Sequence, residues 1–197
     1  MAKEVKEAML WRRSNYDLTA KLPISDAALQ ALLKTVAEAA PSPMNVQSGR
    51  LVLLLGDRHK KLWEIVRETL HRVVNDAEAF KSTEAKIEGF AAGYGTVLYY
   101  NLPQKITALQ GKYPTYAHNF PRWADQVQGI LLQSVWTALA GEGIAANVQH
   151  YNPLIDEAVA EAFDIPSDWE LIGQMPFGLP GSLPEPRETD ELLTVRA

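Results

Sequence analysis

The sequence contains no cysteine, which excludes thiol catalysis, disulfide bonds, and metal centres or clusters held by thiolates. It also has no apolar run long enough to cross a lipid bilayer. The first seven residues, Met-Ala-Lys-Glu-Val-Lys-Glu, carry too many charges for a secretion signal. These absences lead us to expect a cytoplasmic protein without a membrane-spanning segment.

A broad excess of positive charge is missing as well. The chain has 19 Lys and Arg against 24 Asp and Glu, a net charge of −5, which disfavours non-specific binding of nucleic acid. The four histidines are far apart in sequence and have little carboxylate support, so we expect no metal site. With 197 residues, 47% of them hydrophobic, the chain is long enough for one sizeable core, and we expect a single domain over residues 1–197.

Several familiar catalytic motifs are absent too. The chain has no P-loop and no Gly-x-Ser-x-Gly sequence. Gly93-Tyr94-Gly95 is only a fragment of a dinucleotide fingerprint, and it precedes a predicted strand instead of following one, so a Rossmann site is not expected. Carboxylates occur on many predicted helix faces, but no pair stands out as the acid and base of a hydrolase.

Hydrophobic spacing predicts helices along much of the chain. Ser25 is a suitable N-cap for one of them. Another is apolar on nearly all sides, which is typical of a helix at the centre of a domain or in a subunit interface. The predicted helices cover residues 3–13, 26–39, 58–74, 81–91, 124–141 (the apolar one) and 154–164.

Apolar and β-branched runs predict strands over residues 50–55, 96–100, 144–148 and 169–175. Prolines and aromatic residues between 103 and 123 predict an irregular cover. This order predicts an α+β fold, with a mixed central sheet flanked by helices. Residues 177–197 are rich in proline and end in an apolar stretch, so we expect an extended arm that crosses a surface, including that of a neighbouring copy, and adds a strand there.

The candidate functional residues are hydrogen-bond donors and amides on loops. Two guanidinium groups and a hydroxyl follow one another at Arg12, Arg13 and Ser14, and arginine matches phosphate with two parallel bonds. Taken alone, these residues are more typical of a solvated basic edge. Further donors are Ser42, Asn45, Gln47, Gln149, His150, Tyr151 and Arg187. The combination suits a phosphate-bearing ring cofactor, which needs cations for the phosphate and amides for the edge of a flat heterocycle.

Several strings together resemble the FMN-dependent nitroreductase family over nearly the whole chain. They are Arg-Arg-Ser at 12–14, Pro-Ser-Pro-Met-Asn-Val-Gln at 41–47, Ala-Lys-Ile at 85–87, Gly-Tyr-Gly-Thr-Val-Leu at 93–98, and Gln-His-Tyr-Asn-Pro-Leu-Ile-Asp at 149–156. The resemblance is closest to a short subgroup that includes fungal nitroreductase-like proteins linked to fatty-acid repression and their bacterial relatives.

The resemblance implies a homodimer with FMN held between the two protomers. NADH or NADPH would supply two electrons, and a nitroaromatic or quinone-like compound would accept them by a ping-pong mechanism. Because FMN carries the chemistry, no catalytic acid–base pair is required of the protein. The helix at 124–141 would lie in the interface, and the C-terminal arm would embrace the partner.

The resemblance also implies roles for individual residues. Arg12 and Ser14 would contact the FMN phosphate or ribityl chain, with Arg13 contributing. Asn45 would reach the flavin edge near N5, and Gln47 would bond the pyrimidine side, from the partner subunit together with Ser42. Gln149, His150 and Tyr151 would line the other side of the flavin ring. Lys86 and Arg187 would make additional contacts to the phosphate.

Two positions depart from the family pattern. Tyr16 stands where many members have a basic residue that stabilises reduced flavin, and either Arg13 or Arg50 could supply this charge. Ser48-Gly49 stands where many members have proline and an aromatic residue. Two alternative functions remain open at the level of sequence: a flavin-binding redox regulator or sensor with incidental reductase activity, and a dimeric interaction protein without a cofactor.

Overall fold

The structure, a computed structural model, describes residues 3–74, 76–185 and 188–196. The helices of this part are α1 (Val5–Trp11), α2 (Asp26–Ala39), the 3₁₀ turn η1 (Pro43–Asn45), α3 (Gly56–Val73), α4 (Ala77–Ala91), α5 (Pro103–Lys112), the 3₁₀ segment η2 (Pro114–Asn119), α6 (Phe120–Gly141) and α7 (Asp156–Phe163). The strands are β1 (Leu18–Thr19), β2 (Gly49–Leu55), β3 (Gly95–Asn101), β4 (Ala145–Ala146) and β5 (Glu170–Pro180).

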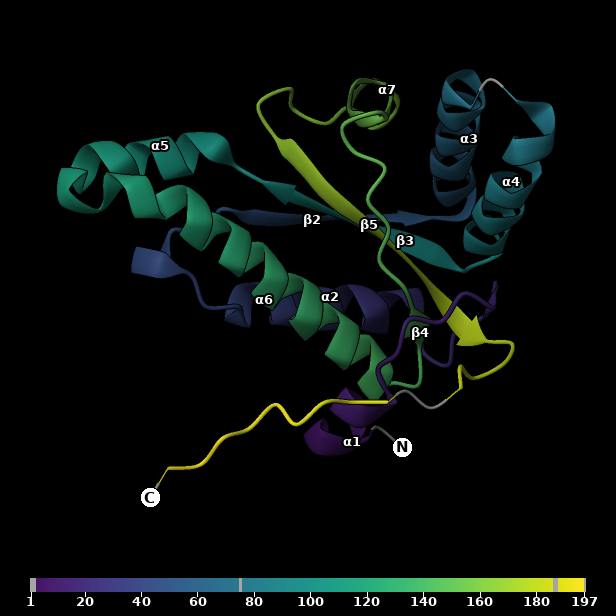
Figure 1. The fold of residues 1–197 in the computed structure, drawn as a ribbon, viewed down its shortest axis with the longest axis horizontal. Coiled ribbons are helices and arrows are strands. Elements are labelled where there is room, and N and C mark those ends of the chain that lie inside the picture. The colour runs from purple at the N-terminus through teal and green to yellow at the C-terminus, as the bar shows by residue number, and fades with distance from the viewer. Residues whose placement is uncertain (1–2, 75, 186–187, 197) are drawn as a thin grey trace.

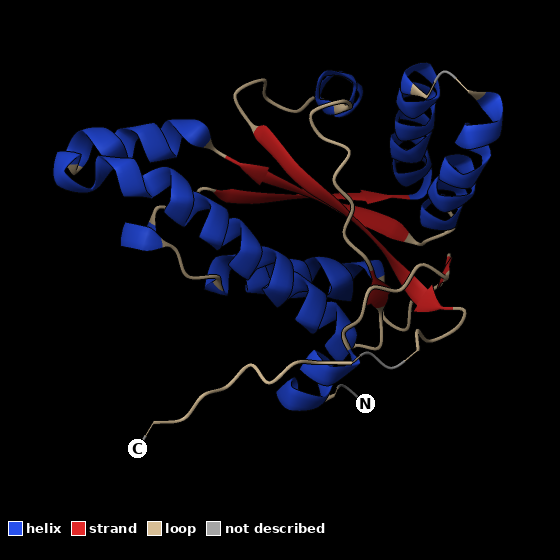
Figure 2. Cartoon of the chain, in the orientation of Figure 1, coloured by secondary structure: helices blue, strands red, loops and turns tan. Residues whose placement is uncertain are grey.

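The strands form one sheet in the order β1-β5-β3-β2, and β4 pairs with β5 beside this path. All these strand pairs are antiparallel, whereas Ser14 and Ala146 form an isolated parallel bridge. The expected α+β class with a central sheet flanked by helices is confirmed (Figure 2), although the strands of the described residues pair antiparallel, where a mixed sheet was expected.

Helices cover both faces of the sheet (Figure 1). One core cluster joins Leu98 and Tyr100 of β3 to side chains of α3, α4 and α7. The second cluster joins Val97 and Tyr99 of the same strand to α2 and α6. Since successive side chains of a strand point to opposite faces, burial on both sides explains why β3 is apolar along most of its length.

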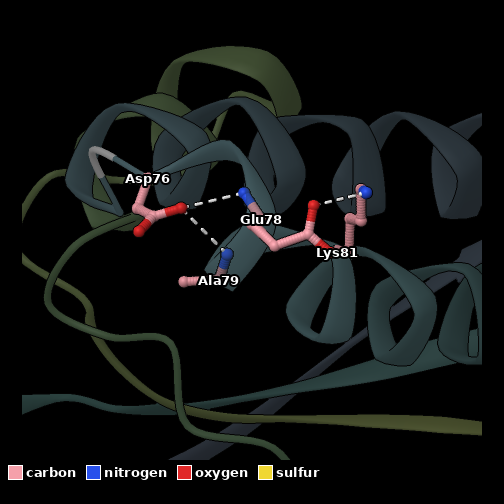
Figure 3. A network of polar contacts seen from close by, with 4 residues as sticks. All are labelled: Asp76, Glu78, Ala79 and Lys81. Carbon is pink, nitrogen blue, oxygen red and sulfur yellow. Dashed lines mark hydrogen bonds and ion pairs between the residues drawn. The ribbon is translucent and has the colours of Figure 1, made fainter.

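Capping side chains determine where α2 and α4 begin. Ser25 Oγ accepts a hydrogen bond from the Ala28 amide at 3.2 Å, so α2 begins at Asp26 as predicted. Helix α4 begins four residues before the predicted start at 81, because Asp76 caps it. One Asp76 carboxylate oxygen accepts from the amides of Glu78 and Ala79 at 2.9 and 3.1 Å, and Glu78 forms an ion pair with Lys81 (Figure 3).

The prediction of an irregular cover between 103 and 123 was wrong. Helix α5 and the segment η2 occupy most of this region, and α6 begins at Phe120. Pro103, Pro114 and Pro121 all lie in the first turn of their elements, where a missing N–H costs nothing. The prolines that suggested interruptions therefore begin helical segments.

The boundary of the C-terminal arm was also wrong. Strand β5 continues through Pro180, and Phe177, assigned to the arm, is fully buried in the core. Gly178 allows the strand to pass close to β1, since a Cβ atom there would lie 2.1 Å from the carbonyl oxygen of Thr19. Beyond Gly181, the residues that the structure describes form neither helix nor strand. Strand β1 was missed, because two residues are too few to show a periodic pattern.

No helix in the described ranges combines the length and apolar character needed to span a membrane. The expected cytoplasmic location stays a prediction.

A buried polar network joins α3 to β3 and to the end of α4. His59 Nδ1 lies 2.9 Å from Thr96 Oγ1, and His59 Nε2 lies 3.1 Å from the carbonyl oxygen of Ala91. Trp63 Nε1 donates to the same Thr96 oxygen at 3.1 Å. A carbonyl only accepts, so Nε2 carries the hydrogen and Nδ1 accepts from the threonine hydroxyl. Burial lowers the pKa of His59, the bond to Ala91 opposes this shift, and the charge of Lys60 adds to it.

This network makes the free energy of unfolding dependent on pH. The pKa of His59 is lower in the folded than in the unfolded chain, so its contribution is complete above about 6.5 and decreases as the pH falls toward the folded value. We expect urea unfolding to show a larger loss of stability between pH 7.5 and 5.5 in the wild type than in His59→Gln. His118→Gln, which alters a histidine outside this network, serves as control, and an equal pH dependence in wild type and His59→Gln would contradict the assignment.

Candidate functional site

The Arg-Arg-Ser stretch follows α1 and lies against the end of the sheet and against α6. The Arg12 guanidinium lies over the ring of Trp136, 4.5 Å from its centre. Arg13 Nη2 donates to the carbonyl oxygen of Glu185 at 2.9 Å. Ser14 forms the parallel bridge with Ala146 beside β5. The three predicted donors are therefore fixed at one place by contacts to distant parts of the chain.

The next residue, Asn15, holds this stretch in position, and the sequence analysis missed it. Only 4% of Asn15 is exposed. Its side chain accepts from the Asp17 amide at 2.9 Å and donates to the carbonyl of Ser182 at 2.7 Å. Its backbone bonds to Ala146 O at 3.0 Å and accepts from Asn147 Nδ2 at 2.8 Å. One indication of this role was visible in the sequence, because Asn15 directly follows the donor stretch. Asparagine is common in exposed loops, however, so its type did not indicate a buried residue.

Beside this stretch lies a cavity of about 530 Å³, which we name the α4 cavity. Its lining residues are Tyr16, Ala85, Lys86, Gly89, Phe90 and Gln149. Tyr16 is 59% exposed and its ring centre lies 6.2 Å from that of Phe90. Gln149 is held by backbone bonds to Gln174 and donates from Nε2 to Asn147 Oδ1 at 2.7 Å. The fold thus brings two predicted residues, Lys86 and Gln149, to the same cavity as Tyr16.

His150 and Tyr151 follow Gln149 but do not line the α4 cavity. His150 is exposed and its ring lies against Gly173, where an added Cβ would be 3.4 Å from Nε2. The Tyr151 amide donates to Gln174 Oε1 at 2.9 Å, and its ring packs edge-on against Trp63 with ring centres 6.2 Å apart. Burial raises the pKa of Tyr151, so its hydroxyl stays protonated at neutral pH.

The remaining predicted residues lie on the loop of residues 42–48, which we name the 42–48 loop. Ser42 Oγ accepts from the Gln47 amide at 3.0 Å, while Met44, Asn45 and Gln47 have φ angles of 52°, 52° and 48°. Asn45 is exposed. Ser42 and Gln47 line a second cavity of about 500 Å³ between α2, β2 and α6, which we name the β2 cavity.

The α4 cavity and the β2 cavity share no lining residue. Within one chain, two predicted residues, Lys86 and Gln149, lie at the α4 cavity, whose lining residue Tyr16 follows the Arg-Arg-Ser stretch in the chain. The residues of the 42–48 loop form a separate group, with Ser42 and Gln47 at the β2 cavity. Arg187 was predicted to join the first group, but it lies outside the described residues.

Comparison with known proteins identifies this arrangement. The antiparallel sheet with its covering helices is a nitroreductase-like α+β fold: the structure of the nitroreductase CinD from Lactococcus lactis in complex with chloramphenicol matches it with a TM-score of 0.89 at 35% identity, covering 98% of this chain and 100% of that one. Residues 9–179 match the family model of the nitroreductases. The chain therefore belongs to the nitroreductase family, which places it among the oxidoreductases.

Two further matches agree. The nitroreductase FRM2 of Saccharomyces cerevisiae is 33% identical over 177 residues, covering 88% of this chain and 86% of its own. A nitroreductase with bound FMN from Desulfitobacterium hafniense matches with a TM-score of 0.73 at 20% identity and complete coverage of both chains, which shows a common fold.

Asn15 offers a test of how the donor stretch is held. We expect Asn15→Leu to lower the free energy of unfolding by about 2 kcal/mol, because the Asp17 amide and the Ser182 carbonyl lose their buried partner. Urea denaturation measures this loss. Asn119→Leu is the control, since Asn119 makes no capping bond at the start of α6. Equal stability of Asn15→Leu and wild type would show that these bonds do not hold the stretch.

Proposed function

We propose that this protein is an FMN-dependent oxidoreductase that passes two electrons from NADH or NADPH to nitroaromatic or quinone-like acceptors. The observation that carries the proposal is that Lys86 and Gln149 line the α4 cavity together with Tyr16, which follows the donors Arg12, Arg13 and Ser14 closely in the chain, in a member of the nitroreductase family. The FMN bound to the relative from D. hafniense supports the choice of cofactor.

The chemistry of the donor set fits FMN. Two guanidinium groups, a hydroxyl and an ammonium group can neutralise and bond a phosphate dianion. The amide of Gln149, fixed by Asn147, can bond the edge of a flat ring. Arg13 and Arg50 each donate to backbone carbonyls, whereas Lys86 lines the same cavity as Tyr16.

FMN, when bound, would supply the capacity to accept and release two electrons, so the protein itself needs no acid–base pair. The role of the chain is to bind the phosphate, orient the ring and leave one face of it open to both substrates. If the donor and the acceptor use that open face in turn, the kinetics are ping-pong.

The solved complexes of CinD support a nitroaromatic compound as the electron acceptor and a nicotinamide nucleotide as the electron donor. They contain chloramphenicol and 4-nitrophenol, two compounds with a nitrophenyl group, and nicotinic acid, whose pyridine ring resembles that of nicotinamide. CinD is 35–36% identical to this chain and has nearly the same length.

We expect the purified protein to be yellow, to lose its visible flavin absorbance on addition of NADH or NADPH, and to reduce 4-nitrophenol in steady state. The spectrum before and after each nucleotide also shows which donor is preferred. A flavin-loaded protein with negligible turnover would favour the redox regulator or sensor, and a colourless protein that takes up no added FMN would contradict the proposal.

Arg12→Ala extends this test to one residue. A charged hydrogen bond to phosphate contributes about 1.5–3 kcal/mol, so FMN affinity should fall by roughly ten- to a hundredfold. Arg122→Ala removes an exposed guanidinium near the start of α6 and should leave the affinity unchanged. Unchanged affinity in Arg12→Ala would remove Arg12 from the site.

The separation of the two groups supports a homodimer as the functional unit. A second copy that places its 42–48 loop over the α4 cavity would bring Ser42, Asn45 and Gln47 to the donors of the first copy. The tail offers a means of association, because Leu192, Leu193 and Val195 are 88%, 73% and 77% exposed, which is costly in water unless another surface covers them.

We expect sedimentation velocity to give a dimer for the wild type and a shift toward monomer for the double variant Leu192→Asp, Leu193→Asp. FMN affinity should fall together with dimerisation, since the 42–48 loop of the second copy would no longer reach the cofactor. Asp190→Asn changes the charge of the same segment without removing apolar surface and should remain dimeric. A monomeric wild type that binds FMN tightly would contradict the dimer.

A further inference from the structure

The 42–48 loop is held in an unfavourable backbone conformation. Met44 and Gln47 have φ angles of 52° and 48°, in the left-handed region that costs an ordinary L-residue roughly 1–2 kcal/mol. Hydrogen bonds inside the loop, from Asn45 N to Ser42 O and from Val46 N to Pro43 O, are 3.0 Å long. Such strain persists only where surrounding groups stabilise it.

Two cationic side chains outside the loop donate to its backbone. Lys105 Nζ lies 3.2 Å from the carbonyl oxygen of Val46 and 3.1 Å from that of Gln47. Arg50 Nη1 donates to the same Gln47 oxygen at 2.8 Å and to Gly49 O at 2.7 Å. The Gln47 carbonyl thus accepts from an ammonium and a guanidinium group, and charged donors make stronger bonds than neutral ones.

Helix α5, which carries Lys105, is joined to the loop by further contacts. The Leu102 amide, just before α5, donates to Ser48 O at 2.9 Å. The side chain of Val46 packs against the apolar cluster of Ile106, Phe120 and Ala124. Within the part of the chain that the structure describes, neither Lys105 nor Arg50 takes part in an ion pair, so both are directed at carbonyl groups.

We propose that Lys105 is a positioning residue: it fixes the 42–48 loop in its left-handed conformation and so presents Asn45 and Gln47 to the cofactor. The inference rests on the proposed FMN site for its functional meaning. Without Lys105, the loop would relax to other conformations, and apparent affinity falls in proportion to the fraction of loops that remain competent to bind.

The test compares Lys105→Met with Lys105→Arg and Lys112→Met in the full-length protein. Lys112 lies at the other end of α5, with its ammonium over the ring of Tyr113, so its replacement gives the same charge change away from the loop. Two quantities are measured: the NMR hydrogen-exchange rates of the Asn45, Val46 and Gln47 amides, and FMN affinity from flavin fluorescence. Far-UV circular dichroism checks folding.

We expect exchange to become about tenfold faster and FMN binding about tenfold weaker in Lys105→Met, because a competent fraction of about one tenth raises the apparent Kd tenfold. Lys105→Arg, which keeps a charged N–H donor on a long side chain, and Lys112→Met should remain within about threefold of the wild type. If Lys105→Met does not fold, Lys105→Gln, which keeps an N–H donor, should show smaller changes in the same direction.

The two readouts separate the possible failures. Unchanged exchange in Lys105→Met or Lys105→Gln would overturn the role of Lys105 in ordering the loop. Faster exchange with unchanged FMN affinity would overturn the link between the loop and the cofactor. A wild type that binds no FMN would instead refute the proposed function, while the exchange rates would still decide whether Lys105 orders the loop.

Discussion

The pairing of β5 with its neighbours is the interaction on which the rest of the structure depends. This strand pairs with β1, β3 and β4, and Gln174 within it forms a further bridge with Gln149. The Arg-Arg-Ser stretch is tied to the same place, because Ser14 bridges Ala146 of β4. The tail that leaves β5 then returns to this stretch through Ser182 and Glu185. Three segments far apart in sequence are thus ordered by one strand at the edge of the α4 cavity.

The sequence predicted the elements whose signal is local. The helix at 26–39 was found to the residue, since both its capping serine and its apolar spacing are visible in the chain. The last strand was predicted to start at 169, one residue before β5, but its predicted end came too early, because Gly178 and Pro180 are typical of loops. Their place in β5 depends on the close approach of β1, with Gly178 passing Thr19. That contact is formed by distant residues and cannot be read from the local pattern.

The candidate site was predicted in part for the same reason. Residue types and short sequence motifs indicated which side chains could bind the cofactor. They did not indicate that Lys86 and Gln149 line one cavity while Ser42 and Gln47 line another. The contacts of Asn15 and Lys105 were missed, because each side chain bonds to backbone groups of another segment. A hydrogen bond from a side chain to a distant carbonyl leaves no spacing in the sequence.

The segment between Pro103 and Asn119 connects packing with the proposed function. Its aromatic content led to the expectation of an irregular cover, yet it forms α5 and η2 around the apolar cluster that includes Phe120. The same cluster receives Val46, and the same helix carries Lys105 to the carbonyls of the 42–48 loop. The strain in that loop is therefore balanced by apolar packing against α5 and the start of α6, and by charged hydrogen bonds from Lys105 and Arg50. If the proposed cofactor supplies the redox chemistry, holding amides in place is the task that remains for the chain, and under our proposal this segment would contribute to it from outside the site.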